Sequence, residues 1–172
     1  MARQFIFRTS FILFLTLSIN FVNGQNAFNA FIAQEGDVSF RITKPGFFVH
    51  ISQNGKITGY GALKSGTISY DFNGRVDKMG MLDISYDFSG RIEKIGTTNI
   101  SYDFSGRVHK IGTTNISYDF SGKVDKIDGQ SISYNFNGKV DKIGSATISY
   151  NFNGKVDKIN DDDDFVVFIQ KI

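Results

Sequence analysis

Hydrophobic and polar residues alternate along most of this chain, and over residues 68–160 the alternation repeats with a fixed period. Six copies of one pattern follow each other sixteen residues apart, beginning at Ile68, Ile84, Ile100, Ile116, Ile132 and Ile148. Each copy reads Ile-Ser-Tyr-Asp/Asn-Phe-Asn/Ser-Gly-Arg/Lys and continues into a second short apolar run. A period of this kind is typical of stacked structural units that contact mainly their neighbours.

Each copy predicts two β-strands joined by a tight turn. In the second copy, residues 84–88 alternate large apolar with small or polar side chains, as a half-buried strand does. Ser89-Gly90 follows, and residues 91–95 lead the chain back. Gly readily adopts the positive φ angle of a tight hairpin turn and Asn tolerates it, so the Asn-Gly and Ser-Gly pairs favour chain reversal. No helical period occurs in the array.

The register of each hairpin depends on the length of its turn. A two-residue turn pairs, from the turn outward, Phe88 with Arg91, Tyr86 with Glu93 and Ile84 with Ile95. It puts an Ile–Tyr–Phe ladder on one side of the sheet, with Arg over Phe as a cation–π pair, and Ile92 on the other side. A three-residue turn with a Gly bulge instead pairs Asp87 with Arg91 and flips the returning strand. The Asn-Gly copies favour the two-residue turn, and the Ser-Gly copies leave both open.

The predicted fold class is all-β, an antiparallel β-hairpin repeat array that runs as a meander. Charged residues fall on both sides of the predicted strands, so neither side is a proper core face and we expect a thin or single-layer twisted sheet. The alternative is a β-solenoid, in which each sixteen-residue unit makes one coil and identical residues stack.

The chain divides into four segments. Residues 1–24 read as a signal peptide, with Arg3 and Arg8 ahead of an apolar run that is too short for a membrane span. Residues 25–67 predict an N-terminal β-hairpin cap that includes a decayed repeat, found by aligning Gly55 with Gly74. The six repeats occupy residues 68–160. Residues 161–172 predict an acidic linker and a C-terminal capping strand. The expected location is therefore secreted, either periplasmic or extracellular.

Charge and composition restrict the partners. Without residues 1–24 the chain carries 17 Lys and Arg against 17 Asp and Glu, so it offers no electrostatic footprint for nucleic acid. We expect no membrane span after signal cleavage. The strands have five or six residues, whereas an outer-membrane barrel needs about 9–11. There is no cysteine, which excludes a disulfide framework.

Candidate chemistry is sparse, and we expect no enzyme, no cofactor and no metal site. His109 stands where other copies have Asp or Glu, which indicates drift at an exposed position, and His50 falls inside a predicted strand. Asp161 to Asp164 supply oxygen atoms that calcium prefers, but they lack the spacing of a calcium loop and read as a solvated linker.

A row of tyrosines is the candidate ligand site. It contains Tyr70, Tyr86, Tyr102, Tyr118, Tyr134 and Tyr150, one at the same place in each copy. Such a row can stack sugar rings or line a protein contact. The alternative, which we favour, is cross-strand packing, because Ile and Phe share its predicted face.

The motif Tyr-Asp-Phe-Asn/Ser-Gly-Arg, as at Tyr70 to Arg75 and Tyr86 to Arg91, resembles the YD repeat of RHS-type and teneurin-like proteins. The last two copies here carry Tyr-Asn, and the last three carry Gly-Lys. The resemblance covers residues 68–160 in a short, sixteen-residue form. It implies extracellular or cell-surface β-sheet repeats.

These observations predict a secreted or cell-surface, non-catalytic repeat protein that acts as a structural, adhesive or interaction module. Its partner would be a protein or a glycan at the cell surface. The alternative is a glycan-binding module that uses the tyrosine row.

Overall fold

The computed structural model describes residues 28–160 and 167–170, and all the regular secondary structure in these ranges is β-strand. The first four strands are β1 (Phe28–Ala33), β2 (Val38–Lys44), β3 (Phe47–Ser52) and β4 (Ile57–Ala62). They form a five-stranded sheet in the order β17-β1-β2-β3-β4, in which β17 (Val167–Gln170) runs parallel to β1. We call this sheet the N-terminal sheet.

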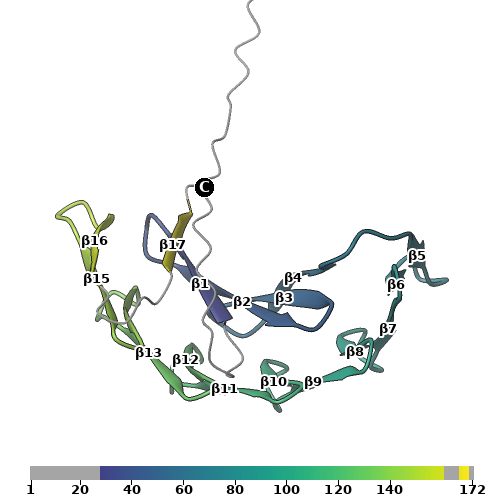
Figure 1. Cartoon of the computed structure of the whole chain (residues 1–172). Coiled ribbons are helices and arrows are strands. Elements are labelled where there is room, and N and C mark those ends of the chain that lie inside the picture. The colour runs from purple at the N-terminus through teal and green to yellow at the C-terminus, as the bar shows by residue number, and fades with distance from the viewer. Residues whose placement is uncertain (1–27, 161–166, 171–172) are drawn as a thin grey trace, which may run out of the picture.

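The six repeats form a second sheet of twelve strands. Its strands are β5 (Ile68–Tyr70), β6 (Val76–Met79), β7 (Leu82–Tyr86), β8 (Ile92–Ile95), β9 (Thr98–Tyr102), β10 (Val108–Ile111), β11 (Thr114–Tyr118), β12 (Val124–Ile127), β13 (Gln130–Tyr134), β14 (Val140–Ile143), β15 (Ala146–Tyr150) and β16 (Val156–Asn160). They are hydrogen-bonded in chain order, each antiparallel to the next, so the predicted meander is confirmed and the solenoid alternative is wrong. The array curves as an open arc around the N-terminal sheet (Figure 1).

Each repeat turns through three residues rather than two. In the second repeat the Gly90 N–H donates to the Asp87 carbonyl at 2.9 Å, and the Asp87 N–H donates to the Arg91 carbonyl at 2.8 Å. Gly90 has a φ of 76°, which a side chain would disfavour. The two-residue turn that the Asn-Gly copies favoured is therefore wrong, and the three-residue alternative with its Gly bulge is confirmed.

A second bulge corrects the register behind the turn. Tyr86 pairs with Ile92, but the next pair joins Ser85 to Lys94, which leaves one extra residue in the returning strand. The two irregularities together restore the predicted pairing of Ile84 with Ile95. The predicted pairing of Tyr86 with Glu93 is wrong. Adjacent repeats are joined differently, by two-residue turns such as the one between Ile95 and Thr98.

The second bulge also gives the array a core face, so the expectation that neither side of the strands is a proper core face is wrong. Ile92 is 7% exposed and Ile95 is fully buried, so both point inward, although Ile92 was expected on the opposite side from Ile95. The N-terminal sheet covers this face, and one apolar cluster contains side chains of both sheets, among them Phe40, Phe47 and Ile127. Full burial of such a side chain contributes about 1.5–3 kcal/mol.

The N-terminal sheet is built on the same hairpin plan as the repeats. At Gly55 the N–H donates to the Ser52 carbonyl at 2.9 Å, and the Ser52 N–H donates to the Lys56 carbonyl at 2.8 Å, as in the repeats. The same two bonds occur at Gly36, in the turn from Ala33 to Asp37. The chain described therefore contains eight hairpins of one turn type, of which the sequence revealed seven.

Backbone hydrogen bonds attach the two N-terminal turns to four of the repeats. The carbonyls of Gln53 and Gly55 accept from the N–H groups of Val124 and Val108, both at 2.8 Å. The carbonyls of Gln34 and Gly36 accept from Val156 at 2.9 Å and Val140 at 3.3 Å. Each N-terminal turn thus engages two consecutive repeats.

A buried polar contact supplements these bonds. The Lys44 ammonium donates to the Thr114 hydroxyl at 2.7 Å, and both residues are buried between the sheets. Burial lowers the pKa of Lys44. No helix in the described ranges is long and apolar enough to cross a membrane.

Candidate functional site

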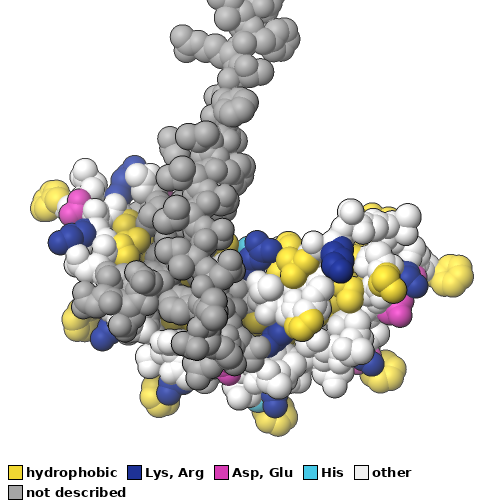
Figure 2. Space-filling model, in the orientation of Figure 1, with side chains coloured by type: hydrophobic (Ala, Val, Ile, Leu, Met, Phe, Trp, Pro, Cys, Tyr) yellow, Lys and Arg dark blue, Asp and Glu magenta, His cyan; other side chains and the backbone are white. Residues whose placement is uncertain are grey.

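The most exposed apolar side chains of the repeats form a row along the tips of their turns. Each is the side chain of the first of the three turn residues, and the accessible surface of that residue is 106–114% of its value in an extended chain. Figure 2 shows hydrophobic side chains that stand away from the surface along the outer margin of the arc. We call this set the phenylalanine row; it contains Phe72, Phe88, Phe104, Phe120, Phe136 and Phe152.

An anchored aspartate holds the turn beneath each phenylalanine in the first repeats. One oxygen of Asp87 accepts from the N–H groups of Ser89 at 2.8 Å and Arg91 at 2.9 Å. The other accepts from the Arg91 guanidinium at 2.7 Å. Hydrogen bonds from the Arg91 backbone and side chain hold the pKa of Asp87 below its usual range. The tip therefore keeps its shape without any contact from Phe88.

The arginine of one repeat also contacts the tyrosine of the next. The Arg91 guanidinium lies 4.3 Å from the ring centroid of Tyr102, at a cation–π distance. The Tyr102 hydroxyl donates back to the Ile92 carbonyl at 2.7 Å. The predicted contact of Arg with Phe in its own repeat is therefore wrong, because Phe88 lies in the turn and the cation stacks on a tyrosine one repeat further on.

Five such joints connect the six repeats. The tyrosines that donate across them are Tyr86, Tyr102, Tyr118, Tyr134 and Tyr150, and the acceptors are the carbonyls of Val76, Ile92, Val108, Val124 and Val140. Each of these rings also lies under the cation of the preceding repeat, at distances between 4.1 and 5.2 Å. The tyrosine contacts are thus the same at all five joints, although the cation changes from Arg to Lys.

Lysine completes the joint in a different way. Asn135 still accepts the backbone N–H groups of Asn137 at 2.9 Å and Lys139 at 3.1 Å, so the turn is preserved without an ion pair. The lysine ammonium then reaches forward: Lys139 donates to the Gly154 carbonyl in the next turn. Lys123 donates in the same way to the Gly138 carbonyl although its repeat keeps Asp119, so the change from Arg to Lys exchanges a side-chain bond within one turn for a bond to the next turn.

The predicted tyrosine row thus separates into five half-buried members and one exposed member. Burial raises the pKa of Tyr86, Tyr118 and Tyr134, and raises those of Tyr102 and Tyr150 to about 12. Tyr70, in the first repeat, is 61% exposed. Ligand binding by this row stays a prediction.

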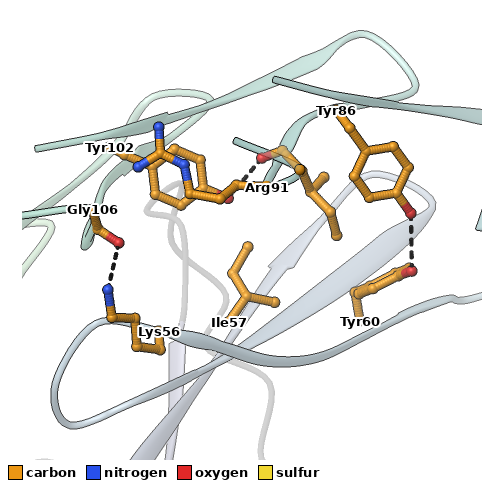
Figure 3. A pocket seen from close by; sticks show the side chains of 9 residues that line it. Lys56, Ile57, Tyr60, Tyr86, Arg91, Tyr102 and Gly106 are labelled. Atoms are coloured by element: carbon orange, nitrogen blue, oxygen red, sulfur yellow. Dashed lines mark hydrogen bonds between the residues drawn. The ribbon is translucent and has the colours of Figure 1, made fainter. Parts of the chain in front are cut away.

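A cavity of about 390 Å³ lies beside two of these tyrosines, where strand β4 faces the second and third repeats (Figure 3). Tyr60 points toward Tyr86, and their hydroxyls are 3.4 Å apart. On the opposite side the Lys56 ammonium donates to the Gly106 carbonyl at 2.9 Å. The remaining lining residues are Ile57, Gly90, Arg91, Ile92 and Tyr102.

Metal and acid–base candidates are few. No cluster of three or more His, Asp or Glu side chains that could hold a metal occurs among the residues the structure describes. His109 is exposed. His50 is half-buried, with its ring 5.5 Å from Phe31 and 5.4 Å from Phe48, and burial lowers its pKa. Asp161 to Asp164 lie outside the described residues.

The sequence did not single out the phenylalanine row. With a two-residue turn, phenylalanine is the last strand residue and packs on the sheet. With the observed turn it becomes the first loop residue and faces solvent. The available signal was the Gly that follows two residues after each Phe, because three-residue loops place Gly at this bulge position.

Comparison with known proteins gives no family for this chain. No protein-family model matches it, and no curated protein matches it. What can be stated of its class is the repeated antiparallel β-hairpin array itself.

Proposed function

We propose that this protein is a secreted, non-catalytic repeat protein that acts as an adhesive or interaction module through its phenylalanine row. The observation that carries the proposal is the full exposure of six equivalent Phe side chains. Isolated exposed apolar residues are ordinary, but the same large apolar residue at the turn tip of all six repeats is not explained by packing. Two observations support secretion. Residues 1–24 read as a signal peptide, and the repeats resemble YD repeats, which are extracellular.

The row suits a partner with repeated binding sites. Each Phe presents an aromatic ring that can bury about 150–250 Å², and hydrogen-bonded turns hold all six at the same position of each repeat along one margin. A weak contact at one ring raises the effective concentration of the partner at the next ring, so the contacts reinforce each other. This favours a fibrous protein or a polysaccharide over a small ligand. Asn or Ser follows each Phe and supplies a polar group beside the ring.

The test is to remove the rings without changing the turns. In one variant Phe88, Phe104 and Phe120 are replaced together by Ser. In the matched control the next turn residues, Ser89, Ser105 and Ser121, are replaced together by Ala. Both are assayed by surface plasmon resonance against immobilised polysaccharides and extracellular matrix proteins. We expect the Phe variant to lose at least about tenfold in affinity, because multivalent binding depends steeply on the number of contacts, and the control to keep it.

Circular dichroism confirms that both variants fold. Binding that survives in the Phe variant at the level of the control would contradict the proposal. So would turnover of a substrate by the wild-type chain that a single substitution abolishes, because that would make the protein an enzyme.

A second candidate function is glycan binding at the tyrosine row, and the cavity beside Tyr86 and Tyr102 favours it. Aromatic faces together with Lys56 and Arg91 are the groups that stack on sugar rings and donate to their hydroxyls. The matched pair is Tyr102→Ala, which opens the cavity, and Tyr118→Ala, which removes the same joint one repeat away. Loss of glycan-array binding in the first variant alone would support a site in the cavity. Equal binding by both variants and the wild type would exclude it.

A further inference from the structure

We propose that copies of this chain associate head to tail, with the edge strand β16 of one copy adding to the edge strand β5 of the next. The twelve-stranded sheet is open, and these two strands are its edges. Each edge would bind a second copy of the chain. Strand β5 presents the tyrosine side of the joint, strand β16 presents its carbonyl and cation side, and this joint already occurs five times within the chain. The inference does not depend on the proposed function.

The first repeat presents one half of the joint without its partner. Its isoleucine, Ile68, is 55% exposed, whereas the equivalent Ile in the other five repeats is 4–6% exposed. Its tyrosine, Tyr70, is 61% exposed. The Tyr70 hydroxyl has no hydrogen-bond partner within residues 28–160, while the five later tyrosines of the row all donate to a preceding repeat.

The last repeat presents the other half. Val156 and Ile159 are half-buried, although their equivalents in the preceding repeat, Val140 and Ile143, are completely buried. Among the described residues no tyrosine hydroxyl donates to the Val156 carbonyl, which is the acceptor position of the joint. Lys155 occupies the cation position and is exposed, with no following tyrosine ring to cover.

The residues at the two edges match in register. Continuing the array by the observed pairing places Lys158 opposite Thr67 and Ile159 opposite Gly66. The preceding junction in the chain pairs Lys142 with Thr147 and Ile143 with Ala146, which are a Lys–Thr pair and an Ile–small-residue pair. The new junction therefore repeats a combination that the fold already uses. It would also bring Tyr70 to the Val156 carbonyl and beneath the Lys155 ammonium.

The positions of the two edges require two copies for the contact. The two ends of the arc lie on opposite sides of the N-terminal sheet (Figure 1). One chain cannot join its own edges, so the contact must be heterologous, between different surfaces of two copies. Such contacts produce closed rings or open filaments according to the rotation between copies. Unpaired edge strands with exposed apolar side chains promote this association.

Disulfide trapping tests the register directly, because the native chain has no cysteine. In a Thr67→Cys, Lys158→Cys double variant the two thiols face each other across the proposed junction, within disulfide reach. The control pairs Thr67→Cys with Asn160→Cys, two residues out of register, where the diagonal separation of about 7–8 Å exceeds that reach. Under mild oxidation we expect disulfide-linked dimers and larger species from the first pair. The control and each single variant should give little cross-linking beyond random dimers.

A second measurement needs no cysteine. Sedimentation velocity of the wild-type chain across about 1–100 μM should show reversible association, and Ile68→Asp should shift it to monomer. Ile68 is more than half exposed, so this variant should keep the monomer fold by circular dichroism. Phe136→Ser, on the phenylalanine row, should associate like the wild type, which separates this inference from the proposed function. A wild-type monomer throughout the range, or equal cross-linking by both cysteine pairs, would overturn the proposal.

Discussion

The tyrosines on the inner side of the repeats and the phenylalanines on their tips recur with the same period but differ in every contact. Five tyrosine hydroxyls donate to the preceding repeat and five tyrosine rings lie beside a cation. The six Phe side chains are fully exposed. Strict repetition in a sequence therefore has two separable origins here. The tyrosine row is required by the contact between repeats, whereas no contact among the residues that the structure describes requires the phenylalanine row.

Alkaline pH should lower the stability of the array more than any single substitution, because it acts on the tyrosines of all five joints at once. Burial raises the pKa of Tyr102 to about 12, above the value of about 10 for an unfolded tyrosine. A raised pKa contributes stability below about pH 10 that is lost as the pH rises toward about 12. We expect tyrosinate absorbance and loss of the β-sheet circular dichroism signal to develop together in this window. Ionisation of the joint tyrosines without loss of structure would show that the joints do not stabilise the array.

The next effect is that of removing one tyrosine from the middle of the array. Tyr118 donates to the Val108 carbonyl, lies 4.1 Å from the Arg107 guanidinium and packs against Gly55 of the N-terminal sheet. Tyr118→Ala should therefore lower the free energy of unfolding by about 2–4 kcal/mol, somewhat less than for a fully buried aromatic residue. Urea denaturation measures the change. A loss below about 0.5 kcal/mol would mean that the inner row is as dispensable as the outer one.

A smaller change isolates the hydroxyl group. Tyr134→Phe keeps the ring under Lys123 and removes only the hydrogen bond of 2.9 Å to the Val124 carbonyl. We expect a loss of about 0.5–1.5 kcal/mol in the free energy of unfolding, measured in the same urea titration. An unchanged stability would assign the whole contribution of the tyrosine row to ring packing.

The smallest effect is expected on the outer row. Phe120→Ser lies two residues from Tyr118 in the same repeat, but its side chain is fully exposed. The free energy of unfolding should stay within about 0.5 kcal/mol of the wild-type value. A larger loss in thermal or urea denaturation would show that phenylalanine stabilises the turn, and would weaken the assignment of this row to binding.

The strand pairing at the open end of each hairpin could be predicted from the sequence, but the turn and the pairing beside it could not. The alternation of Ile84 to Phe88 and the recurring Gly identified strands, turns and meander, because these signals are local. The pairing of Ile84 with Ile95 was predicted, but through the wrong turn. The bulge at the turn and the bulge behind it shift the register in opposite directions. Ile84 therefore pairs with Ile95 just as it would after a two-residue turn, and the sequence at this pair does not reveal either bulge.

The repeat pattern also could not predict that the N-terminal sheet covers the array. That pattern shows charges on both sides of each strand, and only the second bulge brings Ile92 and Ile95 to one face. The partner of this face lies in residues 28–62, which carry no clear period. A weak signal does exist, since Gly36, Gly55 and Gly74 are nineteen residues apart and all have a positive φ angle. For the candidate site, the tyrosines were found but the exposed phenylalanines were missed, because turn length decides which ring faces solvent.

The bonds from the N-terminal turns to Val108, Val124, Val140 and Val156 have a consequence for how the gene can change. Their donors are backbone N–H groups, which every repeat carries at this position, so four consecutive copies can supply all four bonds. The first two copies make no such bond within the described residues, because neither Val76 nor Ile92 is held in this way. Deletion of one or two copies should therefore leave all four turn carbonyls with a donor, whereas an array of three copies would leave one carbonyl without it. Four is thus the smallest number of copies that the two N-terminal turns can fully engage.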